Sequence, residues 1–208
     1  PVGEPAIIRY VNNSLASVTD VSNTDGAMIL IKTLTASTDN TLSFVNGASD
    51  VVLDSTYKTY IFKFASISNG SNATFNFNVS DDTSSHSYNI DKTTTRFRAY
   101  HKEDGSETNL SYLTSEDLAN GTGVQVLSSV RSDADSSTSG ELWLFNPSST
   151  TYVKHFISSF NSSNGDYCET HYNAGYVNTT AAVTAVQFAM SAGNIAAGTI
   201  KLYGIKDS

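Results

Sequence analysis

The chain has 208 residues, a formal net charge of −8 and only 15% charged side chains. That length suits one globular domain with a sizeable core. Ser, Thr and Asn number 31, 24 and 18, or 73 residues together, whereas Lys and Arg number 12. Binding to nucleic acid depends on clustered basic side chains, so this composition argues against a nucleic-acid partner.

No apolar run approaches the roughly 20 residues that a membrane helix needs, and the first residues lack the basic and apolar regions of a signal peptide. We therefore expect no membrane partner and no secretion by that route. Weak periodicity sets residues 1–26 apart as an extended N-terminal attachment arm, and we expect residues 27–208 to form one β-sandwich domain. The arm's scattered apolar residues would become ordered only on a neighbouring surface. The candidate partner-binding residues are Ile7, Ile8, Leu15, Val18 and Val21.

From residue 27 onward, runs of apolar residues recur between clusters of Gly, Asn, Asp and Ser, a pattern typical of β proteins. The clearest strand is Ala73–Ser80, where strict alternation predicts one buried and one wet face. Tyr57–Ala65 precedes it, and the Asn-Gly turn signal between the two predicts an antiparallel hairpin. Eight further runs bring the expected number of strands to about ten: Ala27–Thr35, Thr41–Val45, Thr95–Tyr100, Gly123–Val130, Glu141–Asn146, Thr151–Ser159, Val183–Met190 and Gly198–Ile205.

Helical patterns are scarce. One helical turn is expected at Thr114–Ala119, where Thr114 could cap the first turn. The alanines of Ala181–Met190 also suit a helix, but its β-branched and aromatic residues favour a strand. A single sheet would leave one apolar face in water, so the strands predict an all-β fold: an antiparallel two-sheet β-sandwich, jelly-roll-like.

No cofactor or metal site is expected. Asp133–Glu141 loosely resembles a calcium loop, but it lacks the required glycine and the bidentate glutamate, so we interpret it as a turn. The four histidines are too far apart in sequence for zinc ligation and are expected at the surface or an interface. Cys168 is interpreted as a small, half-buried apolar residue, because a strand would place it and His171 on opposite faces.

No motif for nucleophilic catalysis or phosphate binding occurs, so the chain is expected not to be an enzyme. Hydrolysis of a polysaccharide would need two carboxylates in one cleft, and nothing singles out a pair such as Glu103 and Glu116. The 11 Tyr, 10 Phe and one Trp leave two readings open. They lie at the core edge or a subunit interface, or some of them stack on sugars. The candidate glycan-binding residues are Trp143, Tyr167, Tyr172 and Tyr176.

Four segments of the last third form a recognisable pattern. They are Leu142–Phe156, with the sequence LWLFNPSSTTYVKHF, then Ala174–Thr180, Val186–Ile195 and Gly198–Lys206. With Asp54–Phe64 upstream, they resemble the β-sandwich virion structural proteins of tailed bacteriophages, of the type common in marine and cyanobacterial phages. The similarity extends over about residues 27–206. These motifs are fold signatures, and no catalytic residue is transferred from them.

The resemblance implies a domain displayed on the exterior of a virion and assembled in the host cytoplasm. Our first hypothesis is a capsid decoration or cement protein, a homo-oligomer of two or three chains that binds the major capsid protein or another virion protein. Many copies would stabilise the shell through mass action and avidity. The alternative is a tail-fibre or head-fibre adhesin that recognises a host-surface glycan. The chain has no shaft repeats of the kind that a fibre would usually need.

Overall fold

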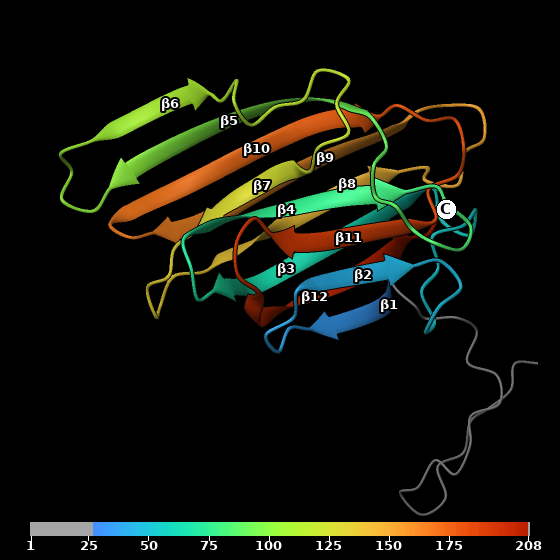
Figure 1. The fold of residues 1–208 in the computed structure, drawn as a ribbon, viewed down its shortest axis with the longest axis horizontal. Helices are drawn as coiled ribbons and strands as arrows, with labels where there is room; N and C mark the ends of the chain where they lie inside the picture. Colours follow the sequence, from blue (N-terminus) through green and yellow to red (C-terminus); the bar gives the residue numbers. More distant parts are fainter. Residues whose placement is uncertain (1–26, 208) are drawn as a thin grey trace, which may run out of the picture.

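The computed structural model describes residues 27–207, which form twelve antiparallel strands and no helix (Figure 1). Ten of these strands match the predicted runs, and the two that the sequence did not reveal are β6 and β10. The strands are β1 (Met28–Thr35), β2 (Thr41–Val45), β3 (Thr59–Asn69), β4 (Ala73–Ser80), β5 (Lys92–Lys102), β6 (Thr108–Tyr112), β7 (Gln125–Val130), β8 (Thr138–Phe145), β9 (Lys154–Asn164), β10 (Tyr167–Val177), β11 (Ala185–Met190) and β12 (Ile195–Ile205).

The strands form two antiparallel sheets, which confirms the predicted all-β sandwich. The large sheet has the order β1-β12-β3-β8-β9-β10-β5-β6, and the small sheet has the order β2-β11-β4-β7. The small sheet covers only part of the large one: β7 contacts β9 and, less extensively, β10, whereas β5 and β6 extend past it (Figure 1). We call β10, β5 and β6 the extension, and the face of the large sheet turned away from the small sheet its outer face.

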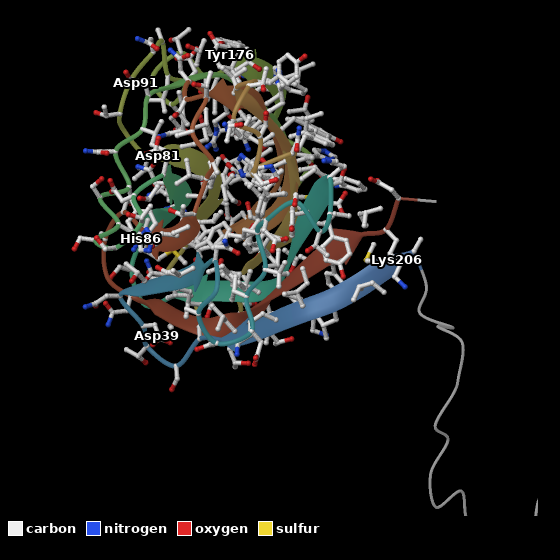
Figure 2. The ribbon with its side chains drawn as sticks, turned by 90° about the vertical axis from the view of Figure 1, so that its right-hand side faces the viewer. Asp39, Asp81, His86, Asp91, Tyr176 and Lys206 are labelled. Carbon is white, nitrogen blue, oxygen red and sulfur yellow. The ribbon has the colours of Figure 1, made fainter. Side chains whose placement is uncertain are left out.

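A cluster of phenylalanine rings from both sheets occupies the centre of the core, and side chains fill the space between the layers (Figure 2). Phe188 of β11 lies in its middle. Its ring centroid is 6.3 Å from that of Phe44, 5.3 Å from Phe62, 5.0 Å from Phe64 and 5.9 Å from Phe75. Such edge-on and offset arrangements add to the free energy gained by burying each ring.

The predicted hairpin is wrong. β3 pairs with β12 and β8 in the large sheet, whereas β4 pairs with β11 and β7 in the small one. The short loop between them, residues 70–72, therefore crosses from one layer to the other. The predicted wet face of β4 is also buried, since Asn76 and Asn78 are only 3% and 6% exposed. Asn78 accepts a hydrogen bond of 2.6 Å from the buried ammonium of Lys92.

Two further local predictions have different outcomes. Residues 114–119 form turns rather than a helical turn, whereas the ambiguous alanine-rich run forms the strand β11. Among residues 27–207 no helix is long and apolar enough to cross a membrane. The arm, with Ile7, Ile8, Leu15, Val18 and Val21, lies outside the described residues.

A β-bulge interrupts the pairing of β12 with β3 in the large sheet. Gly198 has φ +114°, and a Cβ added there would lie 2.7 Å from the carbonyl oxygen of Ser66. Ser66 itself has φ +53°, and the register shifts on either side of it. The position therefore requires glycine, both for its backbone conformation and for the close approach of β3.

Candidate functional site

The two faces of β10 differ in character. Glu169, His171 and Asn173 point to the inner side of the large sheet and are buried, whereas Cys168 and Tyr172 point outward and are exposed. This alternation confirms that Cys168 and His171 lie on opposite faces, but Cys168 is exposed rather than half-buried as predicted. β10 thus supplies a polar network on one side of the sheet and part of an aromatic surface on the other.

A network of buried polar side chains occupies the inner side of the extension. Arg96 Nη2 donates to His171 Nδ1 at 2.9 Å, and Arg96 Nη1 forms an ion pair with Glu116 Oε2 at 3.0 Å. Because arginine cannot accept a hydrogen bond, His171 must be neutral with its proton on Nε2. That nitrogen lies 3.3 Å from Glu169 Oε2 and 3.2 Å from Ser162 Oγ. The geometry therefore assigns one tautomer.

The pKa shifts in this network agree with that tautomer. Burial is the main reason that the pKa of His171 is lowered, and the charges of Arg96 and Arg98 lower it further, although Glu169 works against them. Burial acts to raise the pKa of Glu169, but hydrogen bonds from His171 and Asn164 and the charge of Arg98 outweigh it, so that this pKa is lowered. Burial lowers the pKa of Arg96 to about 10, which leaves it charged at neutral pH.

Next to this network lies a polar pocket of about 230 Å³, which we call the tip pocket. Arg98 connects the two, because its Nη1 binds Glu169 Oε1 at 3.0 Å and its guanidinium lies 5.1 Å from the centroid of the Tyr100 ring. The residues that line the tip pocket are Arg98, Tyr100, Arg131, Asn164, Tyr167 and Glu169.

Hydrogen bonds hold the walls of the tip pocket in place. Tyr167 donates to Glu107 Oε2 at 2.7 Å, and Tyr100 donates to Glu107 Oε1 at 3.3 Å. The rings of the two tyrosines lie edge to face, with centroids 5.5 Å apart. The hydrogen bond to Glu107 is the main reason that the pKa of Tyr167 rises to about 12, so its hydroxyl stays protonated. Arg131 donates to Asn164 Oδ1 at 2.6 Å.

The outer face of the large sheet is the second candidate site. Seven of the nine large apolar side chains that are exposed in residues 27–207 lie on this face. Together, seven partly exposed side chains of this size leave on the order of 600 Å² of apolar surface, distributed from β1 at one edge of the sheet to β6 at the other. They are Met28, Leu30, Phe97, Leu110, Tyr112, Ile157 and Tyr172.

An apolar row crosses five strands of the outer face and links two of these side chains, Leu30 and Ile157. Leu30 of β1 is in register with Tyr203, which is followed by Ile61, Trp143 and Ile157 on the next three strands. Ile61 is fully buried although it lies on the opposite side of β3 from the core, because Tyr203 and Trp143 flank it. At the far end of this face the rings of two exposed residues, Phe97 and Tyr172, stack with centroids 5.1 Å apart.

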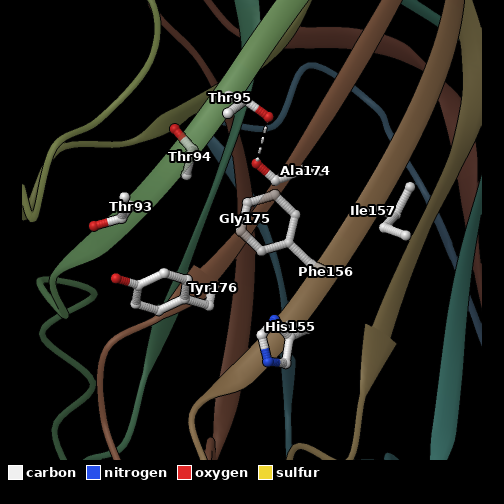
Figure 3. Close-up of a pocket in the computed structure, with 9 residues that line it drawn as sticks. All are labelled: Thr93, Thr94, Thr95, His155, Phe156, Ile157, Ala174, Gly175 and Tyr176. Carbon is white, nitrogen blue, oxygen red and sulfur yellow. Dashed lines mark hydrogen bonds between the residues drawn. The ribbon is translucent and has the colours of Figure 1, made fainter.

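The structure does not bring the four glycan-binding candidates into one patch. Tyr167 lines the tip pocket on the inner side, whereas Trp143, Tyr172 and Tyr176 lie on the outer face. Tyr176 borders a shallow hollow of about 490 Å³ across from Ile157 (Figure 3). The three tyrosines among these candidates all lie on the eleven-residue strand β10.

Sequence reasoning missed most of the polar residues of the inner side. It placed all four histidines at the surface or an interface, but His171 is completely buried. Arg96, Arg98 and Arg131 were not singled out. The alternating polar residues of β5 and β10 were the available signal, but charged and polar residues at alternate positions of a strand are normally assigned to its solvent-facing side. Among the described residues no group of His, Cys, Asp or Glu is arranged to hold a metal ion.

Comparison with protein-family models, with curated proteins and with solved structures finds no match to this chain. The resemblance to bacteriophage virion proteins therefore stays a prediction. Function is inferred below from the geometry of the outer face and the tip pocket.

Proposed function

We propose that this chain is a non-enzymatic structural protein of a virion exterior, a capsid decoration or cement protein that binds the major capsid protein shell. It assembles in the host cytoplasm as a homo-oligomer of two or three chains. The observation that carries the proposal is the apolar outer face. A sheet face with many exposed apolar side chains that no other part of residues 27–207 covers is typical of a protein that packs against neighbours.

The low charge of the outer face supports this role. Its central charged groups are Lys63 and Glu141, which pair with each other at 3.1 Å, and Lys201, which is in register with Lys63, although the chain has a net charge of −8. Docking there would bring few like charges together, and cohesion would depend little on salt.

The order of the strands supports a jelly-roll topology. Without the four strands β5, β6, β9 and β10, the sheets have the orders β1-β12-β3-β8 and β2-β11-β4-β7. Successive strands then alternate between the two layers, except that β4 and β7 are neighbours in the small sheet, and the first strand pairs with the last. Jelly rolls of two sheets and eight strands are common among viral capsid domains. The two inserted strand pairs enlarge the sheet that carries the apolar face.

Binding to virus particles tests the proposal. The full chain would be mixed with particles that lack it and then sedimented with them. We expect Tyr172→Ser, on the outer face, to reduce binding at least tenfold. Tyr152→Ser is the matched control, because Tyr152 is also exposed but lies in a loop outside this face. Equal binding of both variants, or absence of the chain from purified particles, would contradict the proposal.

A second function, recognition of a host-surface glycan, is favoured by one specific observation. Tyr167, predicted as a sugar contact, lines a pocket together with Tyr100, Asn164 and Glu169. Aromatic rings for stacking and planar polar groups for hydrogen bonding to hydroxyls are what a sugar site needs. This function is compatible with a position on the virion exterior.

A further inference from the structure

The tip pocket concentrates positive charge in a chain that has little. The sequence contains four arginines, and two of them, Arg98 and Arg131, line this one pocket of about 230 Å³. Glu169 is the only carboxylate among the lining residues. The lining side chains therefore carry a net charge of +1, opposite in sign to the protein as a whole.

The two guanidinium groups have hydrogen-bonding capacity left. Within residues 27–207 Arg131 forms no ion pair, and its described partner is the neutral amide oxygen of Asn164. Arg98 shares one nitrogen with Glu169, but its Nε is buried and has no hydrogen-bond partner. A planar guanidinium is suited to bind a carboxylate through two parallel hydrogen bonds.

The remaining walls restrict the ligand further. Glu169 in the lining and Glu107 behind the two tyrosines would repel a ligand with two negative charges. The same carboxylates accept hydrogen bonds, so they complement a ligand that also carries hydroxyl donors. The pocket is smaller than the roughly 300–1,000 Å³ of drug-sized sites, which suits a single ring.

We propose that the tip pocket binds one sugar residue that carries a carboxylate, a uronic acid of an acidic glycan. Arg131 and Arg98 hold the carboxylate. Glu169 accepts hydrogen bonds from the hydroxyls, Asn164 donates hydrogen bonds to them, and Tyr100 and Tyr167 pack against the ring. This inference rests on the second function proposed above and names its ligand class. It does not depend on docking through the outer face.

Calorimetry on the full chain tests this assignment with two matched probes, a galacturonic acid trisaccharide and the corresponding galactose trisaccharide. We expect binding of the acidic probe alone, weakened by added salt. Arg131→Gln should reduce its affinity at least tenfold, because a charge-assisted pair is lost. Arg131 is exposed, so the fold should be retained. Lys201→Gln is the control, since it removes one charge from an exposed site on the outer face.

Each other result has a defined meaning. Equal affinity for both trisaccharides would overturn the acidic-sugar assignment and leave glycan recognition standing. Binding of neither probe would overturn both. A third arm with inorganic phosphate separates the anion from the sugar: if phosphate binds as tightly and with the same dependence on Arg131, the pocket recognises an anion alone and the assignment is wrong. An equal loss in Lys201→Gln would mean that only the overall charge matters, which also contradicts it.

Discussion

The two halves of the large sheet carry different kinds of side chain on their inner face. Beneath the small sheet, its inner face presents aromatic and aliphatic side chains such as Phe62 and Leu202 to a dry core. In the extension, the same face presents Arg96, Glu169 and His171, which are buried and connected by hydrogen bonds and ion pairs. Strand pairing is continuous across the boundary, so only the side chains change.

This difference shows what each half is suited to do. A core of packed rings gains its free energy from burial and needs no particular protonation state. A buried polar network depends on every partner being present and correctly charged. The covered half is therefore expected to determine the stability of the fold, and the extension to hold the precisely oriented polar groups of the tip pocket. Variants that perturb each half separately test this division of roles.

The largest effect is expected in the covered half. Phe188→Ala removes the ring that contacts four other phenylalanines and should lower the free energy of unfolding by about 3–5 kcal/mol. Urea denaturation followed by fluorescence measures this change. Phe97→Ala is the control, because Phe97 is 42% exposed on the extension, and it should cost less than about 1.5 kcal/mol. Similar losses in both variants would mean that the ring cluster does not dominate stability.

A pH-dependent effect is expected in the extension. The pKa of His171 is lowered in the fold, so below its unfolded value of about 6.5 the unfolded chain binds more protons than the folded one. The free energy of unfolding should therefore fall as the pH is lowered from 7 to 5. Protonation would also place a hydrogen on Nδ1, against the guanidinium of Arg96. Glu169, whose pKa is lowered, adds a loss only below about pH 4.5.

The measurement is the slope of unfolding free energy against pH between 5 and 7. His171→Gln should remove this slope, whatever it does to stability at a single pH. His101→Gln is the control, because His101 lies on β5 but is exposed. If the slope persists in His171→Gln, another group titrates in this window and the neutral tautomer assigned to His171 does not govern it.

The two halves also differ in how well the sequence revealed them. β2 and β4 have the bounds predicted for them, because alternation between apolar and polar residues is strongest where one face meets the ring cluster. β10 was missed because its inward positions are Glu, His and Asn. β6 was missed because it is a short edge strand that pairs only with β5. Alternation identifies a buried face only where that face is apolar.

The pairing of the strands was harder to predict than the strands themselves. The segment between β3 and β4 has the length and composition of a hairpin loop, yet it connects two layers. A period-2 pattern specifies which side chains share a face, but not which strand lies alongside. The tip pocket was unpredictable for the same reason, because five of its residues come from β5, β9 and β10 and the sixth, Arg131, directly follows β7, and only the pairing of these strands brings them together.

The smallest effect on stability is expected from deleting residues 1–26. Both halves of the large sheet and all twelve strands lie within residues 27–207, so the melting temperature should not change measurably. If the arm serves attachment, through Ile7, Ile8, Leu15, Val18 and Val21, the truncated protein should lose binding to the particle while it keeps its fold. Thermal unfolding and co-sedimentation on the same samples separate the two outcomes. Saturation of the particle by the truncated chain would assign attachment to the outer face alone.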